Sequence, residues 1–151
     1  MLSTLIYLEN DLDQYLMLHR TKKANDINHG KWIGIGGKFE YGESPMECLE
    51  REVLEESGQA LSTTVFRGVV TFIYANQEPM YIFLYTGKLE NNAVGETREG
   101  DLAWVDKDKI FDLTLWEGDR IFLKALIHTT ATIDMKLVYD ENGVLKKVEK
   151  R

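Results

Sequence analysis

The sequence predicts one α/β (α+β) domain over residues 1–151, in which a mixed β-sheet lies between helices. Three observations predict it: two segments with helical periodicity, several segments rich in β-branched and aromatic residues, and an Asn142-Gly143 pair typical of a hairpin turn. A chain of 151 residues is long enough to bury one proper core. We therefore expect no second domain.

The first part of the chain alternates strand-like and polar segments. Residues 4–8 are expected to form a strand, and residues 15–19 its hydrogen-bonded partner. Residues 21–31 are polar and indicate a loop. Residues 32–37 lead into a glycine-rich turn.

Local rules predict the first helix and both of its ends. Ser44 is a good N-cap, Pro45 suits the first helical position, and Glu47 completes a capping box. Gly58 is a natural stop. The apolar stripe expected to face the core consists of Met46, Leu49 and Val53.

The middle of the chain predicts a long hairpin followed by a loop. Residues 64–74 and 81–89 indicate strands around a turn at residues 76–79. Residues 91–101 are a polar loop. Residues 102–105 indicate a short strand, and residues 106–110 a helical turn.

The last third predicts a second helix and a final hairpin. Residues 119–128 place Ile121, Phe122, Ala125 and Leu126 on one helical face. Residues 131–137 alternate apolar and polar side chains, which is typical of a half-buried strand. Residues 144–148 return antiparallel after the Asn-Gly turn.

Three acids gather on the first helix with little positive charge to balance them. Glu52 is three and four positions from Glu55 and Glu56, so the three side chains are neighbours on the helix surface. Arg51 is the only base within the helix. Grouped carboxylates suit magnesium or manganese, and such a cation indicates chemistry on phosphates. The alternative is a solvated acidic face, because glutamate is a good helix former.

The run through this helix resembles the signature of the Nudix hydrolases, G-x5-E-x7-R-E-U-x-E-E-x-G-U, where U is aliphatic. Every specified position matches except the last, where Gln59 replaces an aliphatic residue. The matching residues are Gly37, Glu43, Arg51, Glu52, Val53, Glu55, Glu56 and Gly58. The resemblance implies an α/β/α sandwich built on a mixed sheet.

The resemblance also implies a divalent-metal site, occupied by Mg²⁺ or by Mn²⁺. Its implied ligands are the carboxylates of Glu52, Glu55 and Glu56 and the backbone carbonyl of Gly36. Related enzymes often recruit a further acid from a later loop. Glu99 is expected in that place, with Glu96 as its competitor and an ordinary loop acid as the alternative.

The roles of the remaining motif residues follow from the same resemblance. Glu52 is the first candidate for the general base and Glu99 the second. Arg51 is expected to orient the acids, and Glu43 to brace the loop. Lys38 either contacts substrate phosphate or is a solvated lysine.

Outside the motif, most of the chain is similar to the MutT-like oxidised-purine triphosphatases. The resemblance implies that Trp116 stacks on the purine and that Asp119 hydrogen-bonds the base edge. Ile33 stands where the vertebrate enzyme has an asparagine that contacts the base, and Gly118 where it has a second aspartate. The other residues expected to line the pocket are Thr4, Phe72, Tyr74 and Met80.

Structural roles are the alternatives for this pocket. The aromatic residues and the methionine could simply belong to the core, and Trp116 could be a buried anchor before the helix. Asp119 could be the N-cap of the second helix.

The predicted function is a metal-dependent nucleoside triphosphate pyrophosphohydrolase that clears 8-oxo-dGTP and related nucleotides from the DNA precursor pool. One alternative is hydrolysis of another nucleoside diphosphate derivative, such as ADP-ribose. The other is a regulator that binds nucleotides without catalysis. Either way the partner is a small nucleotide.

Composition sets further expectations about partners and location. A net charge of -7 argues against binding a nucleic-acid polymer. The single cysteine, Cys48, excludes an internal disulfide. No apolar run predicts a membrane span, so we expect a cytoplasmic monomer or homodimer.

Overall fold

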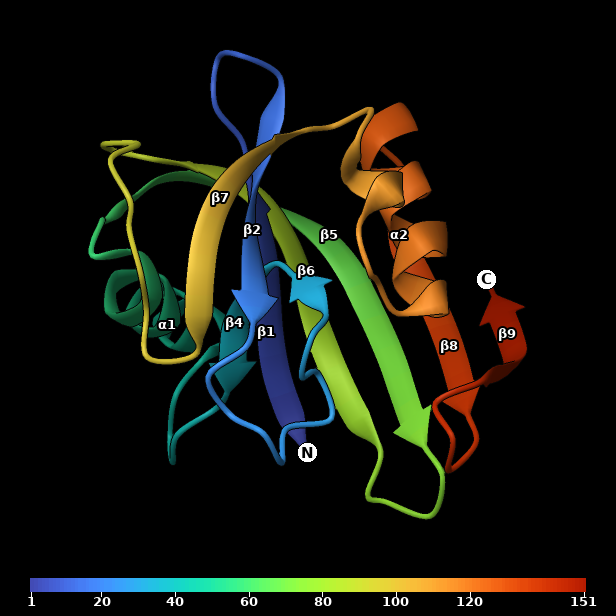
Figure 1. Cartoon of the computed structure of the whole chain (residues 1–151). Helices are drawn as coiled ribbons and strands as arrows, with labels where there is room; N and C mark the ends of the chain where they lie inside the picture. The colour runs from blue at the N-terminus through green and yellow to red at the C-terminus, as the bar shows by residue number, and fades with distance from the viewer.

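The computed structural model describes residues 1–151. Two α-helices and one 3₁₀ turn join nine strands, and the elements follow one another along the chain as β1 (Leu2–Leu8), β2 (Gln14–Arg20), β3 (Trp32–Ile33), β4 (Ile35–Lys38), α1 (Pro45–Ser57), β5 (Leu61–Tyr74), β6 (Met80–Leu89), β7 (Gly100–Asp106), η1 (Ile110–Asp112), α2 (Glu117–His128), β8 (Ile133–Tyr139) and β9 (Leu145–Lys150). Figure 1 shows α1 and α2 on opposite sides of the strands. The predicted fold class is confirmed.

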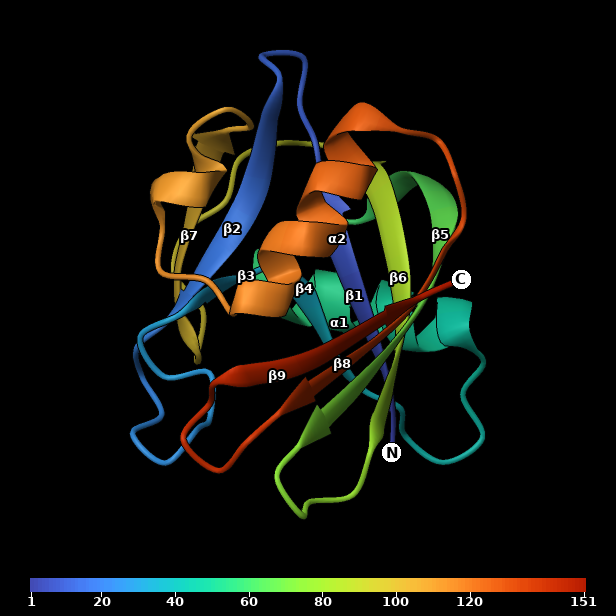
Figure 2. The same cartoon turned by 90° about the vertical axis from the view of Figure 1, so that its right-hand side faces the viewer.

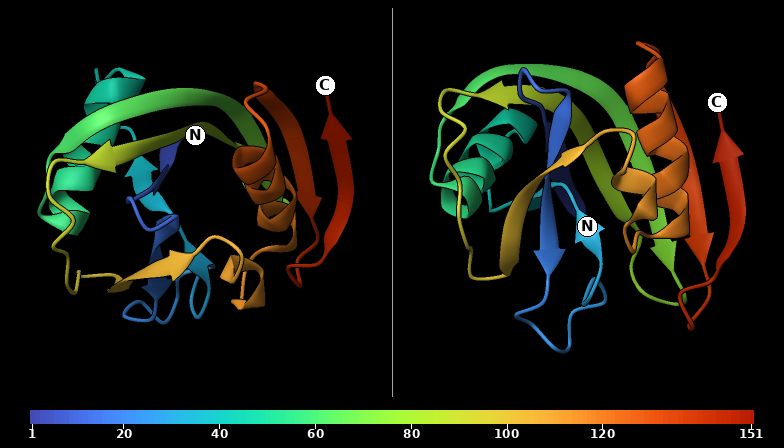
Figure 3. Two further views of the ribbon diagram at one scale, coloured as in Figure 1. Left: turned by 90° about the horizontal axis from the view of Figure 1, so that it is seen from above. Right: turned by 45° about the horizontal axis from the view of Figure 1, so that its top comes forward.

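The main sheet has six strands in the order β4-β1-β6-β5-β8-β9. It is mixed, because β1 pairs with β6 and β5 with β8 in parallel, while its other pairs are antiparallel. The long strands β5 and β6 arch from the side of α1 to the side of α2 (Figure 3). A bulge beside Gly68, where β5 shifts register against β6, accompanies this curvature.

A second, three-stranded antiparallel sheet has the order β3-β2-β7. The prediction that residues 15–19 pair with residues 4–8 is therefore wrong. Both edges of β1 are occupied by β4 and β6, which leaves no free edge for β2. An isolated bridge joins Glu9, just after β1, to Tyr15 of β2, where the chain turns from one sheet to the other.

Helix α1 forms as its sequence predicts. The Ser44 side chain accepts from the Glu47 N–H, the Glu47 side chain accepts in return from the Ser44 N–H, and Pro45 occupies the first turn. Gly58 ends the helix in the left-handed conformation, with φ of 73°. These ends fix which face of α1 is turned to the sheet and which carries the acids.

Two hydrophobic clusters hold the layers together. The smaller cluster lies under α1 and contains Leu49 and Val53, with Met46 packed against it. The larger cluster lies under α2 and joins both sheets; its aromatic members are Tyr7, Tyr15, Trp116, Phe122 and Tyr139. Figure 2 shows β8 and β9 beside α2, where they close this side of the molecule.

Helix α2 begins two residues earlier than the sequence predicts. Trp116 is its N-cap residue and makes no side-chain capping bond. Asp119 is already inside the first turn, so its alternative role as the N-cap is wrong. The helical turn expected at residues 106–110 lies slightly later, as η1. Neither helix is both long enough and apolar enough to cross a membrane.

Candidate active site

Arg51 lies at the centre of the acidic surface on α1. Its guanidinium donates from Nε to Glu43 Oε2 at 2.8 Å and from Nη2 to Glu43 Oε1 at 2.9 Å. Nη1 donates to Glu52 at 2.8 Å and to Glu55 at 3.5 Å. The hydrogen bonds with Arg51 hold the pKa of Glu43 at about 2, and Glu43 in turn raises the pKa of Arg51. Arg51 thus joins the preceding loop to the helix and positions two predicted ligands.

Glu43 also braces the loop itself. Its Oε1 atom accepts from the Glu40 backbone N–H at 2.7 Å, which closes the turn before α1. The Lys38 carbonyl accepts from Arg51 at 3.1 Å, so the end of β4 is fixed to the same guanidinium. The Lys38 side chain is exposed. It therefore extends from the edge of the acidic surface.

The Glu52 carboxylate lies directly against the backbone of Gly37 on β4. A Cβ atom on Gly37 would stand 2.5 Å from both Cδ and Oε1 of Glu52. Burial raises the pKa of Glu52, and the bond with Arg51 opposes that shift. Glycine is needed at position 37 because any side chain there would occupy the place of this carboxylate.

We expect Gly37→Ala to leave the fold intact and to lower turnover. The new methyl group displaces only the flexible end of Glu52, and a misplacement of about 1 Å at a reacting group can reduce rate by up to about 100-fold. Gly95→Ala is the matched control, because a Cβ there meets nothing within 4 Å. Thermal unfolding and nucleotide hydrolysis of both variants check this, and equal activity of the two would contradict it.

Glu56 is buried, and one of its oxygens is unpaired. The residue is 8% exposed, and its Oε2 atom has no hydrogen-bond partner. Burial raises the pKa of this carboxyl, and the charge of Glu99 raises it further. A buried carboxylate oxygen without a partner is unfavourable, and a bound cation would satisfy it. The carboxylates of Glu56 and its neighbours are hard oxygen donors, which fit Mg²⁺ or Mn²⁺.

Glu99 faces the helix acids, and Glu96 does not. The negative charge of Glu99 acts on both Glu52 and Glu56. Its side chain is 19% exposed and pairs with Arg20 at 2.9 Å. The Glu96 side chain is 77% exposed and pairs with a lysine on the loop surface. The geometry favours Glu99 over Glu96 as the further acid.

No three acidic side chains lie close enough together in this structure to share one ion. Arg51 holds Glu52 and Glu55 toward itself, and the Glu55 side chain remains 44% exposed. Gly36 lies opposite Leu5 in the pairing of β4 with β1, so its backbone is fixed within the sheet edge that α1 covers. Glu52 and Glu55 are therefore paired with Arg51, which partly balances their negative charge.

A second group of side chains forms an aromatic cluster between α2 and the main sheet. The Trp116 ring lies edge-on to those of Phe72, Tyr74 and Tyr139, with centroid distances of 5.3, 5.9 and 4.8 Å. Its indole N–H donates to the Asn28 side chain at 2.6 Å. Trp116 is 4% exposed, so the cluster is closed in this structure.

Asp119 lies beside this cluster as a buried acid. The residue is 6% exposed and stands in the first turn of α2. Burial raises the pKa of Asp119 to about 8, against the opposing charge of Lys31. The Asp119 charge in turn raises the pKa of the Tyr7 and Tyr139 hydroxyls, although burial is the larger cause for both. A neutral Asp119 can both donate and accept hydrogen bonds.

The structure brings some of the expected pocket residues together and separates one. Phe72 lies opposite Met80 in the pairing of β5 with β6. Ile33 packs against the same core cluster as Trp116. The Thr4 hydroxyl instead contacts the Cys48 sulfur at 3.4 Å under α1. The side chain of Thr4 therefore lies with the acidic helix and apart from the aromatic cluster.

Gly118 has a packing role that the sequence did not indicate. A Cβ at this position would stand 2.6 Å from the Tyr139 hydroxyl and 2.5 Å from Leu137. The same hydroxyl accepts from the Gly118 N–H at 2.8 Å. Tyr139 therefore occupies the space that a second aspartate would need.

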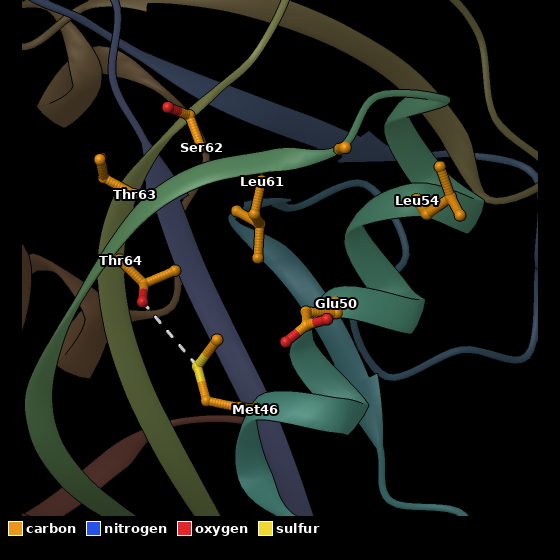
Figure 4. A pocket seen from close by; sticks show the side chains of 8 residues that line it. Met46, Glu50, Leu54, Leu61, Ser62, Thr63 and Thr64 are labelled. Carbon is orange, nitrogen blue, oxygen red and sulfur yellow. Dashed lines mark hydrogen bonds between the residues drawn. The ribbon is translucent and has the colours of Figure 1, made fainter.

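Figure 4 shows a hollow between α1 and the start of β5. Its lining is mostly apolar or hydroxyl-bearing and consists of Met46, Glu50, Leu54, Ala60, Leu61, Ser62, Thr63 and Thr64. None of the acids around Arg51 and none of the aromatic cluster contributes to it. It has no arrangement suited to catalysis.

Comparison with known proteins identifies the family. A profile of the NUDIX domain matches residues 1–126. The chain belongs to the NUDIX domain family. This Nudix hydrolase is 32% identical over 135 residues to the uncharacterized Nudix hydrolase YvcI of Bacillus subtilis, covering 80% of this chain and 79% of that protein.

Two further similarities concern a named activity and the fold. The chain is 31% identical over 109 residues to the oxidized purine nucleoside triphosphate hydrolase of Danio rerio, covering 70% of this chain and 68% of that protein. A crystal structure of a MutT protein from Bacillus halodurans superimposes with a TM-score of 0.87 at 23% identity, covering 99% of this Nudix hydrolase and 96% of that chain. This last similarity shows a shared fold.

Several residues of this Nudix hydrolase that contact the site were missed from sequence. The contacts of Asn28 and Arg20 are made by loops and have no local sequence signature, and Tyr139 lies two residues beyond the strand predicted at residues 131–137. Lys31 did have a signal. It stands two positions before Ile33, which was one of the expected pocket residues.

Proposed function

We propose that this Nudix hydrolase is a metal-dependent nucleoside triphosphate pyrophosphohydrolase that converts oxidised purine nucleotides, such as 8-oxo-dGTP, to the monophosphate and pyrophosphate. Its cellular role would be to clear such nucleotides before a polymerase uses them. The similarity to the Danio rerio enzyme supports the substrate class. The observation that carries the proposal is the buried Asp119 carboxyl, which stands three residues after Trp116 in the first turn of α2.

The acidic surface supports the metal-dependent part of the proposal. Nudix hydrolases generally depend on a divalent metal. Glu56 offers an unpaired buried oxygen, and Glu52 and Glu99 lie close enough for their charges to act on it. Glu55 and the Gly36 carbonyl complete the proposed ligands. Divalent cations held there would offset the charge of the substrate's phosphate oxygens and favour deprotonation of the attacking water.

The protein's own residues would position the reaction. Glu52, fixed between Gly37 and Arg51, is the first candidate to accept the proton of the attacking water, and Glu99 is the second. Arg51 would keep these acids oriented, and Lys38 would contact the phosphates from the edge of the site. Water would then attack within the triphosphate in line with the leaving group, a step that depends mainly on positioning.

The aromatic cluster would bind the base. Trp116 would stack on the purine, with Phe72, Tyr74 and Met80 around it and Ile33 nearby. Asp119, neutral below about pH 8, would present a donor and an acceptor to the base edge. A site that satisfies its buried polar groups only with the matching base discriminates strongly against others.

A nucleotide panel with magnesium tests the proposal. It includes 8-oxo-dGTP, dGTP, 2-hydroxy-dATP and ADP-ribose, scored for pyrophosphate release and for nucleoside monophosphate. We expect 8-oxo-dGTP to give the highest kcat/KM. Much faster turnover of ADP-ribose would instead identify a nucleoside diphosphate hydrolase, and binding without turnover at any magnesium concentration would identify a regulator.

We expect Trp116→Leu to raise KM for every purine nucleotide by a factor equivalent to about 1–3 kcal/mol of base stacking. Leucine keeps apolar bulk in the core but removes the aromatic face. Trp104→Leu is the matched control, since Trp104 lies on β7 and donates to the Asn92 carbonyl away from the cluster. Steady-state kinetics on folded samples provide the measurement, and an unchanged KM would refute the stacking role.

A further inference from the structure

Lys31 ends the loop of residues 21–31 in a fixed backbone position. Its N–H donates to the Asn28 carbonyl at 2.8 Å, and its carbonyl accepts from the Arg20 N–H at 2.9 Å. The pairing of β2 with β3 thus continues through Lys31. The next residue, Trp32, begins β3 and stacks on His19 of β2 with a centroid distance of 4.4 Å.

The Lys31 ammonium lies over the aromatic cluster. Its Nζ atom is 4.3 Å from the centroid of the Trp116 ring. The other two lysines of the loop, Lys22 and Lys23, each pair with a glutamate at 3.3 Å. Lys31 has no such partner, and its charge acts on the buried Asp119 carboxyl. An ammonium group therefore stands inside the proposed base site.

A base and this ammonium compete for the same ring. Trp116 is 4% exposed, so a purine reaches its face only when the Lys31 side chain moves off it. Because the Lys31 backbone is held at both its N–H and its carbonyl, the displaced ammonium stays at the rim of the site, near Asp119. An ammonium has three donors and no acceptor, so it must find acceptors there.

We propose that Lys31 is a specificity-determining residue whose ammonium donates to the keto oxygen of a bound purine and so selects 6-oxopurine over 6-aminopurine nucleotides. The inference rests on the proposed function, since it requires the base to bind at Trp116. Guanine presents acceptors at O6 and N7, which is the edge that lysine commonly reads. Adenine presents an amino donor at position 6, which would face the ammonium, and keeps only N7 as an acceptor on that edge.

This assignment also accounts for Ile33. The hydrophobic side chain of Ile33 cannot donate to a base, and it packs against the core cluster that contains Trp116, the ring over which Lys31 lies. Lys31 therefore supplies a donor on the side of the pocket where Ile33 offers none. The class of substrate it favours includes dGTP, 8-oxo-dGTP and dITP.

The test compares dITP with dATP in wild type and in Lys31→Met, Lys31→Arg and Lys124→Met variants. These two nucleotides differ only around position 6 of the base. We expect wild type to prefer dITP and Lys31→Met to lose about tenfold of that preference, mainly through KM. Lys31→Arg should keep most of it. Lys124→Met is the matched control, because Lys124 lies 5.9 Å from the Phe111 ring and outside the site.

Binding of dIMP and dAMP without metal provides a second readout that needs no turnover. Tryptophan fluorescence should show tighter binding of dIMP to wild type and no difference in Lys31→Met. An equal loss for both bases, or no base preference in wild type, would overturn the assignment. If the protein hydrolyses no triphosphate, the proposed function fails, but the comparison of dIMP with dAMP still tests the role of Lys31. If neither monophosphate binds, the role proposed for Lys31 is refuted.

Discussion

Glu56→Gln is expected to lower nucleotide turnover by at least about 100-fold while the protein stays folded. The carboxylate is the buried acid whose Oε2 atom has no partner in the protein. An amide of the same shape cannot supply the negative charge that a divalent cation needs. Because burial disfavours the charged form, the neutral amide should leave the metal-free protein as stable as wild type, or more so.

Glu50→Gln is the matched control for this substitution. Glu50 is an exposed acid on the same helix and faces the hollow beside β5. Calorimetric titration with Mn²⁺ and thermal unfolding with and without metal should accompany the kinetics. Wild type and Glu50→Gln should gain stability with the metal, and Glu56→Gln should gain little. Loss of the folded state in Glu56→Gln would show that the residue is structural.

The acidic surface could be predicted because it depends on short-range order. Ser44, Glu47 and Gly58 define the ends of α1 through bonds within a few residues, so the sequence determines which face carries Glu52 and Glu56. The family signature then supplied the chemistry. Even so, the role of Gly37 as the space for the Glu52 carboxylate emerged only from the packing of β4 against α1.

The arrangement of the strands and the closure of the aromatic cluster around Trp116 could not be predicted in the same way. The apolar residues of β2 would suit a strand in either sheet. β2 does not pair with β1 because β4 and β6 occupy both edges of β1. The contact between Asn28 and Trp116 joins residues 88 positions apart. Such contacts depend on how loops fold over the core, and no local periodicity encodes them.

Two features of the structure bear on the two departures from the oxidised-purine pattern, one at position 118 and one near position 33. Position 118 is glycine because the Tyr139 hydroxyl fills the adjoining space, so only one acid, Asp119, can stand there. Position 33 is apolar, but Lys31 adds a donor from the same side. If the base binds as proposed, the pocket has a different set of polar groups from the vertebrate pattern, with a cation in place of an amide.

The second large expected effect is a pH dependence of stability that comes from Asp119, because burial raises the pKa of this carboxyl to about 8. The groups that face it are the hydroxyls of Tyr7 from β1 and Tyr139 from β8, and the ammonium of Lys31. In the unfolded chain an aspartate titrates near pH 3.9. Between these two values the folded state binds the extra proton, so this group's contribution to stability falls as pH rises, by up to about 1.4 kcal/mol per pH unit.

Asp119→Asn should remove that dependence, because the amide does not titrate. Relative to wild type, the variant should gain roughly 1–3 kcal/mol in free energy of unfolding between pH 6 and pH 8. Other titrating groups are shared, so they cancel in the difference. Urea unfolding at the two pH values measures it, with Asp108→Asn, an exposed acid, as the control.

The Asp119→Asn substitution also distinguishes base binding by a neutral Asp119 from base binding by a charged Asp119. Asparagine keeps one donor and one acceptor, as a neutral aspartic acid does. If neutral Asp119 binds the purine, Asp119→Asn should retain nucleotide affinity at pH 6 and should not share the change in affinity that wild type undergoes above pH 8. Parallel stability curves for Asp119→Asn and wild type would mean that Asp119 is charged in the folded protein, and Lys31 would then hold it as a buried ion pair.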